Sequence, residues 1–343
     1  VVEVDGSKST LTTITTGSPQ GSILSPLLYL ILVSDLPLWL DPVVDTITFA
    51  DDTSISVGGD SEEEVMRILE RNSEKIFEYF SSNNLVANKD KTCFLFVDKT
   101  KGGRGQGTRE LEMENVTVKE SKAEKLLGLK IDNNLDWSDH VNDTVNGINH
   151  SLFQMRKLRS KVTDEQMRIF GHGMVMSKLN YACSAYGISY LRSDEKCQQV
   201  DTNKRLQKSQ NDLLRVVTKN GYKKNGKNAK IEDMLAETKY LSVTQLVAMQ
   251  QIMSGWNVVH NDIEPLKSII LGQVNTNKEL RSVTNNHIRP DAESFSSFPV
   301  QLKRLWNHNK LDPEFRTTAS KTSAKNIAKN FVLEIIPAIP WKR

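Results

Sequence analysis

The sequence is poor in cysteine, and this shortage excludes two classes of protein. Of its 343 residues only three are cysteines, namely Cys93, Cys183 and Cys197. An odd number at wide spacing argues against a disulfide framework and fits a reducing compartment. Because no Cys-x-x-Cys pair occurs, we expect no zinc knuckle or zinc ribbon.

The sequence also lacks a long unbroken apolar run, and its net charge is small. The longest apolar stretch, Ile23 to Leu40, is broken by Pro26, Asp35 and Pro37. A membrane span needs about 20 mostly apolar residues, so we expect a buried helix here and no membrane partner. Lys and Arg number 45 against 42 for Asp and Glu, and a net charge of +3 does not by itself indicate nucleic acid.

The chain is long enough for two or three modest domains of class α+β. Residues 1–137 mix helix and strand signals and contain a Gly- and Lys-rich insertion loop at 98–110. Residues 138–220 are helical, and residues 221–343 form a C-terminal helical segment of unknown role. Three capping boxes mark helix starts, at Ser61 with Glu64, Thr163 with Gln166, and Ser242 with Gln245.

Two adjacent carboxylates, Asp51 and Asp52, stand between the β-prone runs 43–50 and 53–57. This pattern predicts a hairpin that holds both side chains at its bend. Carboxylate oxygens are the hard ligands that Mg²⁺ prefers, and clustered carboxylates are costly without a cation. Asp-Asp is common in ordinary turns, however, so the pair needs support from elsewhere in the chain.

That support comes from the loop Gly17-Ser18-Pro19-Gln20-Gly21, which precedes an expected helix at 23–34. Glycines let a backbone approach a sugar or a base closely. The amide of Gln20 can hydrogen-bond a base, a sugar edge or a phosphate. A simple loop-to-helix turn would not explain a glutamine between two glycines shortly before a carboxylate pair.

These motifs together resemble the palm of non-LTR retrotransposon reverse transcriptases, with the jockey and CR1-like groups closest. The match consists of Gly-x-Pro-Gln-Gly-Ser-x-Leu-x-Pro at 17–26, an apolar helix ending in Asp35-Leu36-Pro37, and Phe49-Ala50-Asp51-Asp52. Further similar segments follow in the family's order, at Asn88–Thr92 with a strand at 92–97, Leu126–His140, Asn180–Cys183 and Leu305–Asn307.

The resemblance implies a partial right-hand polymerase palm, an antiparallel sheet backed by helices, followed by an all-α thumb and the C-terminal helical segment. It implies an RNA-directed DNA polymerase that transfers nucleotides with two Mg²⁺ ions. The partners would be an RNA template, a DNA primer or target, and a dNTP. The location would be intracellular, as a ribonucleoprotein in the nucleus, the cytoplasm or both.

The resemblance also assigns roles to single residues. Asp51 and Asp52 would be Mg²⁺ ligands, and Leu127 with Gly128 would form the primer grip. Lys91 would lie near the triphosphate as an acid for the leaving pyrophosphate, or would be a solvated lysine at a strand end. The residues bordering the nucleotide and template would be Gly17, Pro19, Gln20, Gly21, Phe49 and Ala50.

Basic residues cluster in the helical part. Residues 201–230 carry nine Lys and Arg against Asp201 and Asp212. Charge alone fits a solvated helix face. Within a polymerase thumb, contact with a phosphate backbone is favoured, and such binding weakens steeply with salt. The candidates are Arg156, Lys157, Arg159, Lys204, Arg205 and Lys208.

Two other functions remain open. The chain could be a non-catalytic relic, or a repurposed protein that binds nucleic acid through its thumb and tail. It could also be a group II intron maturase, which is a related polymerase. The segment Leu135-Asp136-Trp137-Ser138-Asp139-His140 fits the retrotransposon group better.

The chain starts at Val1, after the position where the family has its fingers and its first metal-binding aspartate. We therefore expect the isolated 343-residue chain not to polymerise. A primer-extension assay with this chain alone should show no dNTP incorporation, and measurable extension would contradict the expectation.

Overall fold

The structure, a computed structural model, divides into two compact units. The first comprises Val1–Thr92 with Glu110–Val118, and the second comprises Cys93–Arg109 with Lys119–Arg343. The predicted domain boundaries at 137 and 220 stay predictions. The structure describes residues 3–10, 17–18, 21–97, 109–113, 116–187, 198–219, 229–263, 305–306 and 310–336, which excludes most of the expected loop at 98–110.

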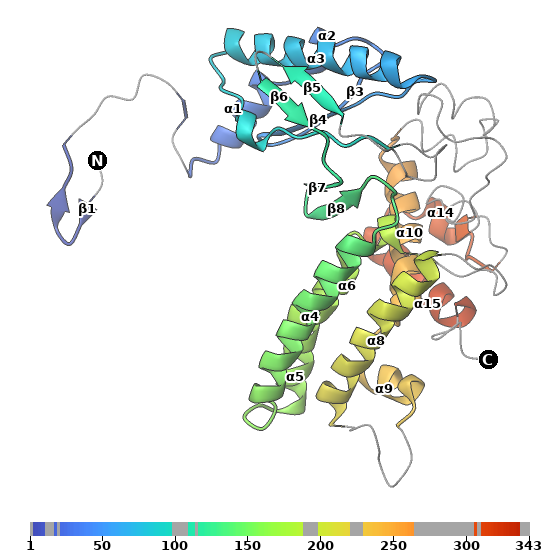
Figure 1. The fold of residues 1–343 in the computed structure, drawn as a ribbon. Helices are drawn as coiled ribbons and strands as arrows, with labels where there is room; N and C mark the ends of the chain where they lie inside the picture. The colour runs from blue at the N-terminus through green and yellow to red at the C-terminus, as the bar shows by residue number, and fades with distance from the viewer. Residues whose placement is uncertain are drawn as a thin grey trace. The chain divides into compact units, whose positions relative to one another are not determined.

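The first unit combines helices with two-stranded ribbons, in agreement with the predicted mixed fold (Figure 1). The β1–β2 and β3–β4 ribbons are antiparallel. The strands are β1 (Glu3–Val4), β2 (Ser7–Lys8), β3 (Asp45–Phe49), β4 (Asp52–Ser56), β5 (Glu110–Met113) and β6 (Val116–Lys119). The helices are α1 (Ser25–Leu32), α2 (Leu36–Trp39), α3 (Glu62–Ser82) and the 3-10 turn η1 (Lys89–Lys91).

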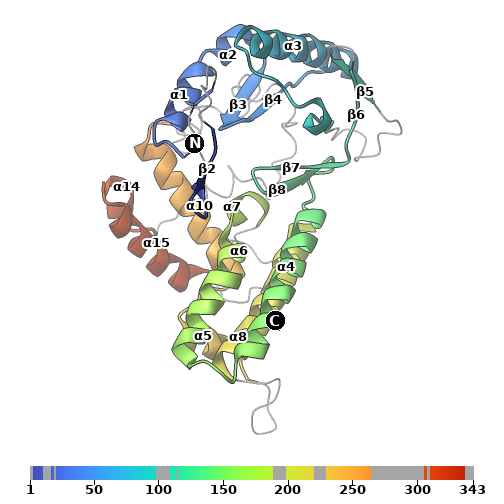
Figure 2. The same ribbon diagram turned by 90° about the vertical axis from the view of Figure 1, so that its left-hand side faces the viewer.

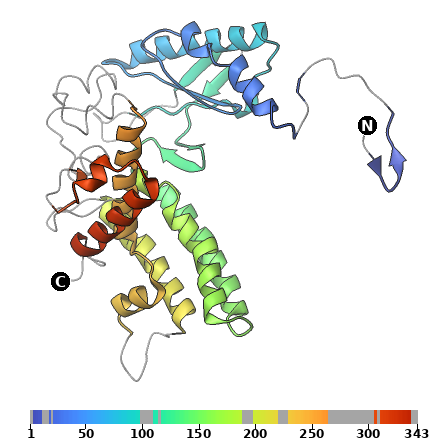
Figure 3. The ribbon, with the colours of Figure 1, turned by 180° about the vertical axis from the view of Figure 1, so that it is seen from behind.

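The long helix α3 organises this unit and lies along the β3–β4 and β5–β6 ribbons, as Figure 3 shows from behind. Of the predicted capping box at Ser61, the N-cap bond is confirmed, because the Ser61 side chain accepts a hydrogen bond from the backbone N–H of Glu64 at 3.2 Å. Ile68 and Phe77 of α3 are buried, as are Leu111 and Met113 of β5. Helix α3 and strand β5 therefore form an apolar contact within the first unit.

The expectation of a buried helix between Ile23 and Leu40 is wrong for α1, which buries none of its residues. The exposed fractions of Leu27, Leu28 and Ile31 are 54%, 55% and 61%. An apolar stripe indicates that a helix can be buried, but burial needs a covering surface, which the described residues do not provide. Among those residues, no helix is both long and apolar enough to cross a bilayer.

The second unit is a helical assembly with one β-ribbon at its start (Figure 2). The antiparallel strands are β7 (Ala123–Leu126) and β8 (Leu129–Asp132). The helices are α4 (Ser138–Leu158), α5 (Asp164–Gly171), the π-helical turn η2 (His172–Met176), α6 (Ser177–Asn180), α7 (Cys183–Tyr186), α8 (Gln198–Thr218), α9 (Ile231–Thr238), α10 (Val243–His260), α14 (Glu314–Thr317) and α15 (Lys321–Ile335).

Helix α10 forms the centre of the second unit. It is apolar around most of its circumference, as expected for a helix covered on all sides, and it packs against α6, α7, α8 and α15. The buried side chains of Val247, Ile252 and Trp256 join one core with Trp306 and Phe315. One continuous core therefore links the helices after residue 138 with the described C-terminal segment.

Two predicted capping boxes in this unit are confirmed. Thr163 with Gln166 starts α5, and Ser242 with Gln245 starts α10. In each box the hydroxyl of the N-cap residue accepts a hydrogen bond from the backbone N–H of the glutamine, and the side-chain oxygen of the glutamine accepts one from the backbone N–H of the N-cap residue. Helix α8 secures the same end of α10, because the side chain of Gln207 accepts from the backbone N–H of Val243 at 2.9 Å.

The turn between β8 and α4 depends on one buried carboxylate, that of Asp132. It accepts hydrogen bonds from the backbone N–H groups of Asn134 at 3.0 Å, Asp136 at 3.1 Å and Trp137 at 2.9 Å. Leu135 and Trp137 have positive φ angles of 55° and 64°, a region that costs side-chain-bearing residues about 1 kcal/mol or more each. Asp132 stabilises this strained connection.

We predict that Asp132→Ala lowers the free energy of unfolding of the second unit by roughly 3 kcal/mol, because it removes three hydrogen bonds to a charged group. Asp132→Asn should cost less, because its amide oxygen still accepts from two of the three donors. Urea unfolding would measure both effects. Asp139→Ala, which removes an exposed carboxylate of α4, is the control. Equal stability of the Asp132→Ala and Asp139→Ala variants would contradict this role.

Candidate functional site

The carboxylate pair lies at the tip of the β3–β4 ribbon, and the predicted hairpin is confirmed. Its register pairs Phe49 with Asp52, which leaves Ala50 and Asp51 as a two-residue turn. Ala50 has a φ of 51°, the positive angle that tight hairpin turns require at their first position. The alternation of Thr46, Ile47 and Thr48 favours the strand that leads to this turn. The ribbon thus holds two adjacent carboxylates at a fixed end.

Both carboxylates are exposed at this tip. Asp52 lies opposite Phe49, so it shares a face of the ribbon with Phe49 and Ile47, which are 63% and 61% exposed. Within the described residues, neither aspartate has a basic partner, and no group of three or more His, Cys, Asp or Glu side chains is placed to hold a metal. The pair could therefore supply two ligands to a cation from outside the described chain.

Sequence reasoning missed Tyr29 of α1, which lies near the pair. Burial raises the pKa of its hydroxyl, and the negative charge of Asp51 raises this pKa further. The second effect requires that the two groups be neighbours, so α1 runs close to the hairpin tip. No sequence signal pointed to Tyr29, because its partner lies in a turn beyond another helix and a strand.

Helix α3 fixes the end of α1 through Tyr79, which is 2% exposed. The Tyr79 hydroxyl donates to the carbonyl of Leu32 at 2.9 Å and to the carboxylate of Asp35. Burial, followed by the hydrogen bond to Asp35, raises the pKa of Tyr79 to about 12, so the hydroxyl stays a donor at neutral pH. This contact gives the Asp35-Leu36-Pro37 motif a structural role.

The chain entering β3 is fixed by the same helix. The carboxylate of Asp41 binds Lys75 at 2.8 Å, the buried side chain of Asn72 at 2.8 Å, and Arg71. The hydrogen bonds from Lys75 and Asn72 hold the pKa of Asp41 well below its usual range. Asn72 also accepts from the backbone N–H of Asp41 at 2.9 Å, so both segments that lead to the site rest on α3.

The upstream loop is described only in part. Gly17 and Gly21 both have a φ of 82°, an angle that favours glycine, and a Cβ built on either would touch nothing within 4 Å. Open space at both glycines agrees with a loop that can receive a ligand. Pro19 and Gln20 lie outside the described residues, so their proximity to Asp51 stays a prediction.

The strand expected at 92–97 is wrong. Lys91 ends the 3-10 turn η1 as an exposed side chain, and the segment after it forms only an isolated bridge between Phe94 and Glu120. The turn is set by Asn88, whose side chain accepts from the backbone N–H of Asp90 at 3.1 Å. This cap holds the residues just before the expected strand in a turn. The assignment of Lys91 to the triphosphate stays a prediction.

The basic residues of the helical unit fall into two groups. Arg156 and Lys157 on α4 are exposed, as are the α8 residues Lys204, Arg205 and Lys208. Arg205 also donates to the side chain of Asn142, which brings the exposed faces of α8 and α4 together. These residues could contact a phosphate backbone.

Arg159 differs from the other basic candidates. Its side chain is 15% exposed and donates to Asp164 at 2.5 Å and to the carbonyl of Val217 at 3.1 Å. It therefore joins the ends of α4 and α8 to the start of α5. This placement favours a structural role over contact with a phosphate backbone.

Residues 2–131, which include the carboxylate hairpin, match the family model "Reverse transcriptase (RNA-dependent DNA polymerase)". Three Drosophila melanogaster proteins are similar. The probable RNA-directed DNA polymerase from transposon X-element is 25% identical over 61% of this chain and 22% of its own length. The RNA-directed DNA polymerase from mobile element jockey is 28% identical over 41% and 16%.

The third relative is the probable RNA-directed DNA polymerase from transposon BS, 27% identical over 49% of this chain and 19% of its own length. No solved structure matches the chain. The chain thus spans about a fifth of the length of these relatives. The exposed carboxylate hairpin lies inside the region that is similar to the reverse transcriptase family, and the similar proteins are named as RNA-directed DNA polymerases of transposons and mobile elements.

Proposed function

We propose that this chain contributes catalytic carboxylates and a nucleic-acid surface to an RNA-directed DNA polymerase. The parent enzyme would copy an RNA template from a DNA primer or target, with dNTPs as substrates and two Mg²⁺ ions as cofactors. It would act inside the cell, in a ribonucleoprotein of the nucleus or cytoplasm. The observation that carries this proposal is the exposed pair Asp51 and Asp52 on a rigid turn within the matched region.

The electrostatics around the pair support metal binding. Between Lys8 and Arg67 the sequence has no lysine or arginine, while it has nine aspartates and glutamates. Of these, Asp41 is neutralised by Arg71 and Lys75. Two adjacent carboxylates in such surroundings repel each other, and a divalent cation relieves that repulsion. Mg²⁺ is commonly held by one or two carboxylates together with water and substrate phosphates, which fits this donor set.

The residues around the pair have distinct roles in this proposal. Asp51 and Asp52 bind the metal, which when bound activates the primer 3′ hydroxyl and offsets the charge of the leaving pyrophosphate. Tyr29, with its raised pKa, stays neutral and adds no negative charge beside Asp51. Gly17 and Gly21 permit close approach of the backbone to the nucleotide or template. Lys91 supplies a proton to the pyrophosphate.

A nucleic-acid-binding protein without catalysis is the second candidate. The exposed basic residues of α8 favour it, since they need no metal to attract a phosphate backbone. The two candidates differ at the carboxylate pair. A catalytic ancestry requires a divalent-cation site there, whereas a purely binding role does not.

We predict that Mn²⁺, used as a paramagnetic probe, binds the isolated chain at the hairpin tip. Asp51→Asn and Asp52→Asn should each weaken binding by about tenfold or more, because each removes a charged ligand. Titration followed by electron paramagnetic resonance would measure this. Asp45→Asn is the matched control, since Asp45 is exposed at the far end of the same ribbon. Equal effects at positions 45, 51 and 52 would argue for diffuse charge attraction and against the site.

We also predict that the α8 basic face binds an RNA–DNA duplex. The double variant Lys204→Ala, Lys208→Ala should bind more weakly. The slope of log affinity against log salt should fall by about 0.9 for each phosphate that the variant no longer neutralises. Fluorescence anisotropy at several salt concentrations would measure both quantities.

The matched control for this surface is Lys325→Ala, Lys329→Ala on α15, which removes the same charge from two other exposed lysines. It should leave the salt slope nearly unchanged. Identical slopes for the two double variants would show that α8 has no specific role.

A further inference from the structure

The turn between β7 and β8 has a backbone that needs outside support. The register pairs Leu126 with Leu129, so Leu127 and Gly128 form a two-residue turn with φ angles of 47° and 85°. Positive angles at both positions match the tight turn favoured in hairpins, for which Asn-Gly is the usual sequence. Leucine is unfavourable at the first position. A contact from elsewhere in the chain would therefore help to hold this turn in place.

Tyr181 makes such a contact. Its hydroxyl donates to the carbonyl of Leu127, which is 54 residues earlier in the chain. Its ring lies against Gly128, where an added Cβ would come within 3.4 Å of Tyr181 Cε1. One side chain thus touches both residues of the turn.

Tyr181 is itself held firmly at the end of α6. Its backbone N–H donates to the carbonyl of Ser177 at 3.0 Å, and its own carbonyl accepts from the hydroxyl of Tyr186 at 3.3 Å. Tyr186 is fully buried in the core of the helical unit. Tyr181 therefore connects the β7–β8 turn to that core and fixes the position of the turn.

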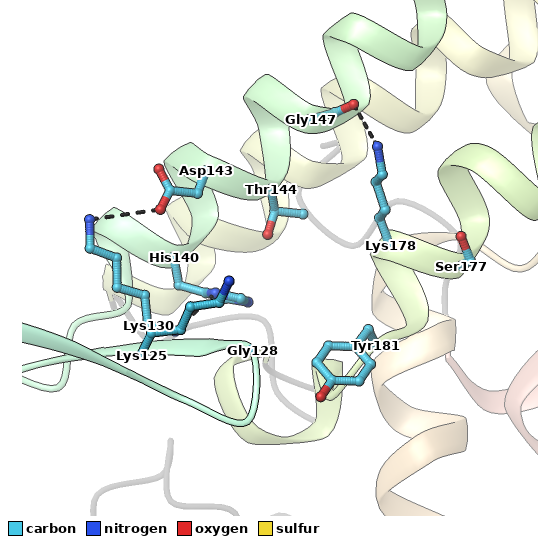
Figure 4. A pocket seen from close by; sticks show the side chains of 10 residues that line it. All are labelled: Lys125, Gly128, Lys130, His140, Asp143, Thr144, Gly147, Ser177, Lys178 and Tyr181. Atoms are coloured by element: carbon cyan, nitrogen blue, oxygen red, sulfur yellow. Dashed lines mark hydrogen bonds and ion pairs between the residues drawn. The ribbon is translucent and has the colours of Figure 1, made fainter. Parts of the chain in front are cut away.

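The hollow beside this turn has a volume of about 410 Å³ and three lysines in its wall (Figure 4). Lys125 and Lys130 lie directly opposite each other across the ribbon, an arrangement in which like charges repel. Lys130 is compensated by Asp139 at 3.3 Å and Asp143 at 3.7 Å. These carboxylates offset the charge of Lys130, so the positive charge left on this pair of lysines is that of Lys125.

The other two lysines are in different situations. Lys178 reaches across to α4, where its Nζ donates to the carbonyl of Gly147 and to the hydroxyl of Ser151, both at 2.8 Å. Lys125 is exposed and has no acidic partner among the described residues. It is the lysine in this wall with charge available for an anion.

We infer that the hollow beside the β7–β8 turn binds one phosphodiester group of a nucleic-acid strand, with Lys125 as the contact and Tyr181 as the positioning residue. This inference rests on the proposed function and makes its primer grip specific. Leu127 and Gly128 shape the turn, Tyr181 fixes its position, and the fixed turn presents Lys125. The Tyr181 hydroxyl donates its proton to the carbonyl of Leu127 and cannot also donate it to a phosphate. Tyr181 therefore affects phosphate binding only by holding the turn in place.

Hydrogen–deuterium exchange tests the positioning role without nucleic acid. Tyr181→Phe removes only the hydroxyl, and exchange of the amides at 126–130 should rise roughly three- to tenfold as the turn loosens. Tyr240→Phe is the matched control, because the Tyr240 hydroxyl also donates to a backbone carbonyl, that of Arg168, at 2.7 Å. It should leave exchange at 126–130 unchanged. The same exchange at these amides in both variants would overturn the positioning role.

Binding of an RNA–DNA duplex, followed by anisotropy across a salt series, tests the role of Lys125. Lys125→Ala should lower both the affinity and the salt slope, the slope by about 0.9. Tyr181→Phe should lower the affinity roughly three- to tenfold with the slope unchanged, because every lysine that faces a phosphate is still present. If Lys125 contacts a strand and not a triphosphate, an excess of dNTP should displace the duplex equally well from the wild-type chain and from the Lys125→Ala variant.

The outcomes separate this inference from the proposal beneath it. If Lys204 and Lys208 carry the salt slope while the Lys125 and Tyr181 variants bind like wild type, this site is wrong and the polymerase surface stands. If the wild-type chain binds no duplex, both are wrong. Preferential displacement by dNTP at Lys125 would identify a triphosphate site and overturn the assignment to a strand.

Discussion

The candidate site depends on two polar side chains of α3 that anchor other segments. Tyr79 holds the end of α1 through Leu32 and Asp35, and Asn72 holds the approach to β3 through Asp41. Because α1 buries none of its residues, apolar packing does not fix it. Fully satisfied hydrogen bonds at buried donors are directional, so they specify one arrangement where an apolar contact would permit several. The proximity of Tyr29 to Asp51 follows from that arrangement.

The features that could be predicted from sequence are those encoded within a few residues. The β3–β4 hairpin and the boxes at Thr163 and Ser242 depend on strand alternation, turn length and three-residue spacing, all visible locally. The burial of α1 could not be predicted, because an apolar stripe does not reveal what covers it. The strand expected at 92–97 was not found, since its β propensity met a partner only at Phe94, in one bridge to Glu120.

The residues that sequence reasoning missed all act over long separations. Tyr79 binds a carbonyl 47 residues away, and Tyr181 binds one 54 residues away. The motif at 180–183 drew attention to Tyr181, but only the fold shows that its hydroxyl ends on Leu127. Arg159 was assigned to a phosphate backbone from its place in a basic cluster of the sequence. In the fold its guanidinium instead binds Asp164 and the carbonyl of Val217 within the helical unit.

The near-neutral composition conceals a division of charge that suits the proposed function. The segment between Lys8 and Arg67 has nine acidic residues and no lysine or arginine, so in the proposed function its hairpin tip would need a cation to approach a triphosphate. The helical unit presents exposed lysines and arginines that attract phosphates directly. A strand bound only by the basic face would gain affinity but no catalysis, whereas the acidic tip alone would repel it. In the proposed function the two surfaces have complementary roles, since a divalent cation would link the carboxylates to phosphates, whereas the basic side chains need no cation to attract them.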